Sequence, residues 1–134
     1  MNTYTTTFKV EAAHLDEHLH VNNVNYVQWV QNIAKKHWET VASKKVLKNY
    51  FWVLTSHCIE YKNEAFLNDT IKVKTHVSNH KGAVSIRIVQ IFNKKTNALL
   101  ASSETKWCLI DLKTKRPTRI TQEISELFMK LIYD

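Results

Sequence analysis

Residues 16–26 read Asp16-Glu17-His18-Leu19-His20-Val21-Asn22-Asn23-Val24-Asn25-Tyr26. The stretch gathers acidic, imidazole and amide side chains directly before a long run with helical spacing of apolar residues. A helix N-terminus presents unpaired backbone N–H groups and the positive end of the helix dipole. Polar groups held there suit a negatively polarised oxygen, such as a carbonyl under attack. The alternative is an asparagine-rich capping loop, because Asn and Asp are favoured helix caps in any protein.

A long helix is expected after this stretch, from about Val24 to Leu47. Apolar residues recur there at three- and four-residue steps, with charged residues between them, which is the period of an amphipathic helix. The apolar stripe is broad, so the helix is expected to be buried on several sides. The stripe consists of Tyr26, Val27, Trp29, Val30, Ile33, Ala34, Trp38, Val41, Ala42 and Val46.

Strands are expected on both sides of this helix in the sequence. A first strand is predicted from Thr6 to Ala13, ahead of the polar loop. After the helix the apolar period changes to two, which is typical of half-buried antiparallel strands. The strands that this pattern predicts cover residues 51–61, 71–77, 84–92 and 99–110.

Turn and cap residues complete the organisation of the chain. Asn79–Gly82 is predicted to be a hairpin turn, with Gly82 at positive φ. A terminal helix is expected from Ile120 to Tyr133, capped by Thr121. These elements predict one α+β domain over residues 1–134, in which an antiparallel five-stranded sheet wraps around a long central helix.

The order Asp-x-x-x-His-Val-Asn-Asn-x-x-Tyr from Asp16 to Tyr26 resembles the signature of the hotdog-fold acyl-CoA thioesterases. The likeness is to the 4-hydroxybenzoyl-CoA thioesterase type and the related acyl-carrier-protein thioesterases. Later segments, 107–111 and 116–120, resemble the last strand and the basic, proline-containing tail of that family, so the resemblance covers nearly the whole chain. It implies a hotdog fold and hydrolysis of an acyl or aroyl thioester to a free acid and a thiol. No cofactor is implied, since coenzyme A is part of the substrate.

The resemblance also implies which residues react. Asp16 corresponds to the catalytic carboxylate, which either attacks the carbonyl or activates water. The backbone amide of Asn23 corresponds to the oxyanion donor. His20 and Asn22 either position the thioester or hold the loop by hydrogen bonds. A second design in the family uses a Glu two turns into the helix, but Val27–Asn32 contains no carboxylate, so the loop-aspartate design is favoured.

Substrate binding is expected from aromatic and basic side chains. Tyr26 is the motif tyrosine, and Trp29 is expected to line an apolar acyl channel along the helix, or to be plain core. Lys81, Arg87 and Arg116, from strand-end turns and the tail, are expected to hold the coenzyme A phosphates, or to be solvated charges.

Two positions depart from the family pattern. Leu19 stands where the family usually has Gly, and His14 stands where many members have a second Asp. Leu19 motivates an alternative function, a non-catalytic acyl-CoA or acyl-carrier-protein sensor of the same fold. A hotdog dehydratase is a weaker alternative.

Composition limits the partners of this 134-residue chain. Its formal net charge of +7 favours an anionic partner such as coenzyme A or an acidic carrier protein. Nucleic acid is not expected, because no recognition-helix or stacking motif stands out. No membrane span or signal peptide is recognisable, so a cytoplasmic location is expected. A homodimer or tetramer is expected, and the resembled family joins sheets edge to edge with each active site at the subunit interface.

Cysteine and histidine content argues against a disulfide framework or a metal site. Cys58 and Cys108 both lie in apolar strand-like runs and are expected to be buried free thiols. No Cys-x-x-Cys pair and no helical His-x-x-x-His occurs in the sequence, so no metal is expected.

Overall fold

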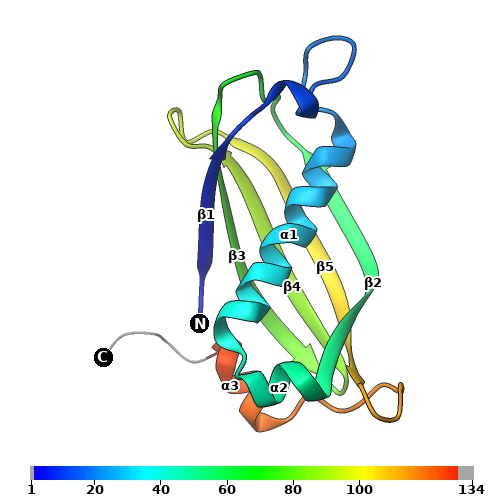
Figure 1. The fold of residues 1–134 in the computed structure, drawn as a ribbon. Helices are drawn as coiled ribbons and strands as arrows, with labels where there is room; N and C mark the ends of the chain where they lie inside the picture. The colour runs from blue at the N-terminus through cyan, green and yellow to red at the C-terminus, as the bar shows by residue number, and fades with distance from the viewer. Residues whose placement is uncertain (1, 130–134) are drawn as a thin grey trace.

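The computed structural model describes residues 2–129. Its strands are β1 (Tyr4–Lys9), β2 (Tyr50–Tyr61), β3 (Thr70–Lys81), β4 (Val84–Asn93) and β5 (Leu99–Asp111). Its helices are a short 3₁₀ turn, η1 (Ala12–His14), and α1 (Asn23–Val41), α2 (Lys44–Asn49) and α3 (Gln122–Met129). All the strands pair antiparallel in one sheet of order β1-β3-β4-β5-β2, which curves around α1 (Figure 1). This arrangement confirms the predicted α+β architecture.

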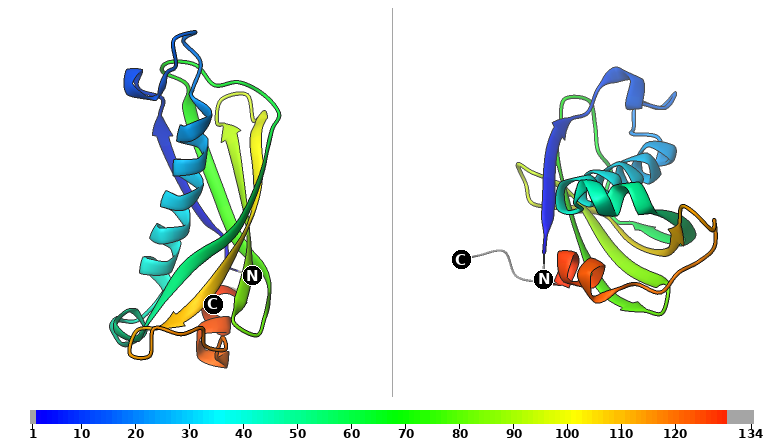
Figure 2. Two further views of the ribbon diagram at one scale, coloured as in Figure 1. Left: turned by 90° about the vertical axis from the view of Figure 1, so that its right-hand side faces the viewer. Right: turned by 60° about the horizontal axis from the view of Figure 1, so that its bottom comes forward.

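The core lies between α1 and the concave face of the sheet. Near the start of α1, the buried side chains of Trp29, Val30 and Ile33 belong to one cluster with residues of β3, β4 and β5. Toward the other end, Trp38 clusters with Leu109 and with α3, which closes that end of the sheet (Figure 2). Burying each such aliphatic or aromatic side chain stabilises the fold by about 1.5–3 kcal/mol.

The prediction of one helix from about Val24 to Leu47 is wrong in one respect, because the structure has two helices there. α1 ends at Val41, and Ala42 takes an extended conformation with ψ 139°. Ser43 then caps α2, its Oγ accepting the N–H of Val46 at 3.2 Å. The prediction failed because the apolar spacing continues through this break. The break forms where the Ser43 side chain can accept a backbone N–H that has no intrahelical acceptor, and so start a new helix.

The first strand is also shorter than predicted. β1 ends at Lys9, which pairs with Thr70, the first residue of β3. Beyond this point the backbone turns, and the N–H of Glu11 donates to the Nδ1 atom of His14 at 2.9 Å. Residues 10–13 therefore do not continue the strand and pair with no strand among residues 2–129.

The hairpin between β3 and β4 is tighter than predicted. Asn79 and His80 pair with β4 and belong to β3, so the turn itself lies at Gly82 and Ala83. Gly82 has φ +62°, as expected. A shift in register at Ser78 allows the longer pairing.

The terminal helix and the cysteines complete the comparison. Thr121 caps α3 as predicted, its Oγ1 accepting the N–H of Ile124 at 3.3 Å. The predicted extension to Tyr133 lies outside the described residues. Both cysteines are free, but Cys58 is exposed on β2, contrary to expectation, while Cys108 is half-buried.

Candidate active site

A small hairpin holds Asp16 at the start of α1. Leu15 and Val21 form an antiparallel bridge, and the N–H of Asp16 donates to the carbonyl of His20 at 2.8 Å. The loop projects at the end of the molecule where α1 begins (Figure 1). The motif is therefore a closed turn tied directly to the helix.

The carboxylate of Asp16 is fixed through one oxygen. Its Oδ1 accepts the backbone N–H of His18 at 2.9 Å and that of His20 at 3.1 Å. The bond from His20 is the main cause that lowers the pKa of Asp16 below its usual value, and the bond from His18 and both imidazoles act in the same direction. Oδ2 has no hydrogen-bond partner among residues 2–129. The group is thus an ionised carboxylate with one oxygen available for chemistry.

The start of α1 leaves one backbone donor without an acceptor. Asn22 is the N-cap, and its Oδ1 accepts the N–H of Val24 at 3.1 Å. The Asn22 carbonyl accepts the N–H of Asn25 at 2.9 Å. The N–H of Asn23 has no acceptor within the described part of the chain. Asn23 therefore presents a free donor at the positive end of the helix dipole.

The helix start and the aspartate loop are joined through the carbonyl of His14. This oxygen accepts the backbone N–H of Asn22 and the side-chain Nδ2 of Asn25, both at 2.9 Å. Asn25 is the third amide of the motif, and no role for it follows from the sequence alone. Its bond fixes the orientation of the first turn of α1.

His20 holds the loop through its side chain. Its Nδ1 lies 3.0 Å from Oε1 of Glu64, and its ring packs edge-on against Phe66 at 5.4 Å between centroids. Glu64 and Phe66 lie in the connection between β2 and β3, which sequence spacing could not place beside the motif. These contacts and the capping role of Asn22 favour the loop-holding interpretation of both residues.

The two departures from the family pattern have distinct structural outcomes. Leu19 has φ +63° and is 69% exposed, so the position where the family has Gly is left-handed, and the leucine side chain points to solvent. The His14 ring packs edge-on against Trp29 at 5.3 Å. The imidazoles that lower the pKa of Asp16 are those of His18 and His20.

Tyr26 and Trp29 belong to the core. Tyr26 is 3% exposed and packs against Trp29 at 5.2 Å and Tyr61 at 5.5 Å. Trp29 lines a cavity of about 270 Å³ between α1 and β1, together with Phe8 and His14. Tyr26 is therefore a core side chain, whereas Trp29 packs in the core and also lines this smaller cavity.

A larger cavity, of about 480 Å³, lies on the other side of α1. It runs between the helix, from Gln28 to Trp38, and residues of β2, β4 and β5. Asp16 lines neither cavity. The helix side chains facing the larger cavity include Gln28, Gln31, Asn32 and Lys35, so the expected apolar channel has a polar helical wall instead.

The basic residues lie away from the loop within one chain. Lys81 ends β3, a 12-residue strand that begins near the loop, so it lies about 35 Å from that end. Arg116 follows β5 at the same far end, and its carbonyl accepts the N–H of Asp111. Arg87 lies within β4, is 5% exposed and is not at a strand end. Within a single chain these cations therefore do not gather at the mouth of the loop site.

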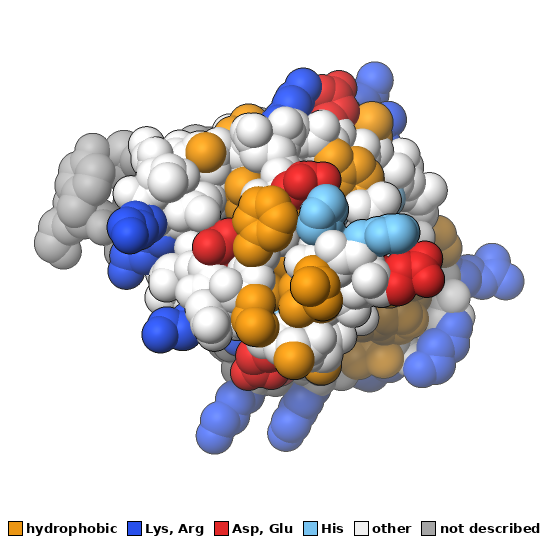
Figure 3. Space-filling model, turned by 90° about the horizontal axis from the view of Figure 1, so that it is seen from above, with side chains coloured by type: hydrophobic (Ala, Val, Ile, Leu, Met, Phe, Trp, Pro, Cys, Tyr) orange, Lys and Arg blue, Asp and Glu red, His pale blue; other side chains and the backbone are white. Residues whose placement is uncertain are grey.

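The end face around the loop is partly apolar. Histidine and acidic side chains lie next to hydrophobic ones there (Figure 3). Large hydrophobic residues exposed in this region are Leu19, Val24, Tyr61, Phe66 and Leu67.

Metal and membrane features complete the description. No group of three or more His, Cys, Asp and Glu side chains is placed to hold a metal ion among residues 2–129. Within the same residues, the helices are too short or too polar to span a bilayer.

Comparisons with known proteins place the chain in a family. The family model for the acyl-ACP thioesterase N-terminal domain matches residues 1–128. The long-chain acyl-CoA thioesterase FadM of Escherichia coli (strain K12) is 23% identical over 132 residues, which cover 95% of this chain and 98% of that protein.

Solved structures agree with this family assignment. The probable thioesterase YbaW from Escherichia coli is 25% identical, with a TM-score of 0.83 over 92% of this chain and 94% of that one. A 1,4-dihydroxy-2-naphthoyl-CoA thioesterase from Synechocystis is 15% identical, with a TM-score of 0.84 over 99% of this chain and 100% of that one. The chain therefore belongs to the acyl-ACP thioesterase family of hotdog-fold proteins and is a thioester hydrolase.

Proposed function

We propose that this protein hydrolyses acyl-CoA thioesters to a free acid and coenzyme A, with Asp16 as the reacting carboxylate and the Asn23 N–H as oxyanion donor. One observation carries the proposal. An ionised carboxylate, held through a single oxygen, shares a hydrogen-bonded loop with a helix-start N–H that has no acceptor among the described residues. The named substrates of FadM and of the Synechocystis enzyme, a long-chain acyl-CoA and an aroyl-CoA, support a coenzyme A thioester as the substrate class.

The chemistry follows from this geometry. Asp16 Oδ2 attacks the thioester carbonyl or takes a proton from an attacking water. The carbonyl oxygen becomes negative and accepts the N–H of Asn23 at the positive end of α1. The carbonyl then re-forms, the C–S bond breaks, and the thiolate of coenzyme A leaves. When Asp16 has attacked, water then hydrolyses the acyl–Asp16 anhydride and releases the free acid. When water has attacked, the free acid forms directly and the proton held by Asp16 passes to the thiolate. A single oxyanion donor contributes about 3–4 kcal/mol to lowering such a barrier.

A thiol-release assay over acyl- and aroyl-CoA substrates tests the proposal. Asp16→Asn keeps the size and the backbone bonds of the loop but removes the charge, and should lower kcat by at least about a hundredfold. Glu17→Gln is the matched control, because Glu17 is an exposed neighbouring carboxylate, and it should retain the rate. Equal rates for wild type and Asp16→Asn on every hydrolysed substrate would contradict the role of Asp16. Tight binding without turnover on the whole panel would favour the sensor alternative.

The oligomer that we propose is a homodimer joined through β2. β2 is a 12-residue edge strand whose outer side has no neighbouring strand among the described residues, and such an edge favours pairing with another chain. Antiparallel pairing of two β2 strands would bring the far end of one subunit toward the loop of the other. Lys81 and Arg116 of the partner subunit could then hold the coenzyme A phosphates.

Light scattering after gel filtration tests this dimer. Val53→Lys places a charge on the exposed face of β2, where Val53 is 42% exposed, and should shift the protein toward monomer. Thr5→Lys places the same charge on β1, the opposite edge of the sheet, and should leave the mass unchanged. A monomeric mass for the wild-type protein would contradict the proposed dimer.

A further inference from the structure

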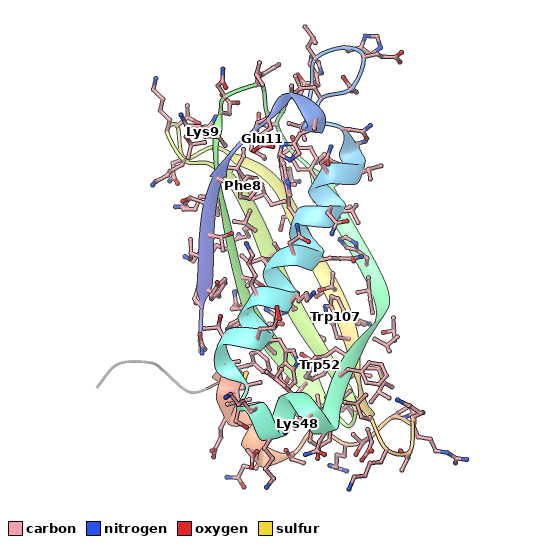
Figure 4. All side chains as sticks on the ribbon, in the orientation of Figure 1. Phe8, Lys9, Glu11, Lys48, Trp52 and Trp107 are labelled. Carbon is pink, nitrogen blue, oxygen red and sulfur yellow. The ribbon has the colours of Figure 1, made fainter. Side chains whose placement is uncertain are left out.

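The larger cavity contains positive charge without a carboxylate. Of the residues that line its approximately 480 Å³, Lys35 and Arg87 are cationic, and none is Asp or Glu. Trp52 and Trp107 lie on the sheet side of the cavity, facing α1 (Figure 4). The cavity lining therefore combines aromatic side chains with two cationic ones and no acidic one.

Arg87 is deeply buried and held by neutral partners. Its Nη1 lies 2.9 Å from Nδ1 of His37 and donates to Oγ1 of Thr75 at 3.1 Å. Its guanidinium carbon lies 5.4 Å from the centroid of the Phe128 ring. No carboxylate among residues 2–129 forms an ion pair with it. A buried charge without a counter-charge is costly, so this arrangement suggests a ligand that supplies the negative group.

His37 cannot supply that counter-charge. Arginine only donates, so Nδ1 of His37 accepts, and the proton on Nε2 faces Oδ1 of Asn2 at 3.3 Å. Burial, and then the nearby Arg87, lower the pKa of His37 to about 3, so the imidazole is neutral near pH 7. Arg87 remains protonated there, although burial lowers its pKa to about 10.

The remaining donors of Arg87 open onto the cavity. Nε and Nη2 have no acceptor among the described residues. Within those residues, no completely shielded side-chain nitrogen or oxygen lacks a partner, so these two groups are reached from the cavity that Arg87 lines. Nε and Nη2 form one edge of the guanidinium, which matches the two oxygens of a carboxylate.

We propose that this cavity binds the distal carboxylate of an ω-carboxyacyl thioester, with Arg87 as the recognition residue. The inference rests on the proposed function, because it places the thioester at Asn23. Along α1 the cavity begins at Gln28, about 8 Å from Asn23, and His37, which contacts Arg87, lies about 21 Å from Asn23. An acyl chain that follows the helix would pass the aromatic walls and bring its far end to the guanidinium.

Matched substrates test the inference. Wild-type kcat/KM for the mono-CoA thioester of hexadecanedioic acid, which is long enough to reach from Asn23 to Arg87, should exceed that for hexadecanoyl-CoA. In Arg87→Met the ratio of the two values should fall at least about tenfold, the change expected for loss of one charge-assisted hydrogen bond. Lys35→Gln removes the second cation and should lower the same ratio to a smaller extent. Lys36→Gln is the control, because Lys36 lines the other cavity, and should leave both values unchanged.

A binding measurement separates this inference from the proposed activity. Hexadecanedioate should alter the tryptophan fluorescence of wild-type protein, because Trp38, Trp52 and Trp107 line the cavity, and should bind at least about tenfold more weakly to Arg87→Met. Such binding without hydrolysis of any thioester would refute the proposed function and leave the carboxylate site standing. Hydrolysis of hexadecanoyl-CoA with no preference for the diacid thioester, together with equal hexadecanedioate affinity in wild type and Lys35→Gln, would overturn the inference even if Arg87→Met failed to fold.

Discussion

Nη1 of Arg87 lies 2.9 Å from Nδ1 of His37, and this contact joins β4 to α1 in the interior of the protein. It requires His37 to be neutral, because a protonated imidazole has no acceptor to offer. His37 is fully buried. Protonation of His37 at low pH should therefore destabilise the folded protein.

Stability should fall as the pH drops below about 6.5. The unfolded chain protonates His37 near 6.5, whereas the folded protein does so only at about 3. Between these values the unfolded state binds more protons, so the free energy of unfolding decreases as the pH falls, by about 1.4 kcal/mol per pH unit for one group. Urea unfolding of wild type and His37→Gln between pH 7.5 and about 4.5 should show the advantage of wild type shrinking at this rate. His18→Gln, at an exposed histidine, should follow wild type, and parallel curves for wild type and His37→Gln would contradict the prediction.

Replacing Asn23 with proline should delete the proposed oxyanion donor while keeping the helix. Asn23 is the first residue of α1, where proline is well tolerated, and Asn22 already has ψ 137°, the conformation that precedes proline. Asn23→Pro should lower kcat by about 10²–10³-fold with an unchanged circular dichroism spectrum. Asn23→Ala keeps the N–H and should retain most of the rate. Equal kcat values for the two variants would exclude the amide as donor.

Leu19→Gly should stabilise the protein slightly. Leu19 has φ +63° and its side chain is 69% exposed, so glycine relieves about 1–2 kcal/mol of backbone strain and loses little burial. The greater freedom of glycine in the unfolded chain offsets about 0.4–1 kcal/mol of this gain. Thermal or urea unfolding should therefore show a net gain of roughly 0.5 kcal/mol. Leu19→Ala retains Cβ and should show no gain; Asn97→Gly, at φ +61°, should gain less because Asn tolerates this conformation.

Ser43→Ala should destabilise the protein, because it removes the N-cap of α2. The Ser43 hydroxyl caps α2 by accepting the N–H of Val46, and loss of such a cap costs about 1 kcal/mol. Ser43→Asp preserves an acceptor and should keep the stability measured by urea unfolding. Ser56→Ala removes an exposed hydroxyl on β2 that caps no helix and should change stability by less than about 0.5 kcal/mol. A stability of Ser43→Ala equal to wild type would show that the cap is dispensable.

Local patterns in the sequence predicted the elements and their class. The alternation of Ile71, Val73, Thr75 and Val77 predicted the buried face of β3, and these four residues are buried. The Asp16–Tyr26 motif predicted a polar loop ahead of a helix, and Asn22 caps that helix. Such features depend on residues a few positions apart, so their physical causes, side-chain period and capping, are readable along the chain.

Contacts between distant segments were decided only by the tertiary structure. The pairing of His20 with Glu64, the burial of Arg87 against His37, and the distance of Lys81 from the loop all depend on how the sheet curves around α1. Arg87 is expected from the sequence to hold phosphates from a strand-end turn, but it lies within β4 and points inward, like Ser85 and Val89, which are both buried. The sequence by itself determined which segments become helix, strand and reactive loop, because those preferences are local. Only the tertiary structure decided which partner each charged side chain contacts, because burial and contacts between distant segments arise only when the sheet closes around the helix.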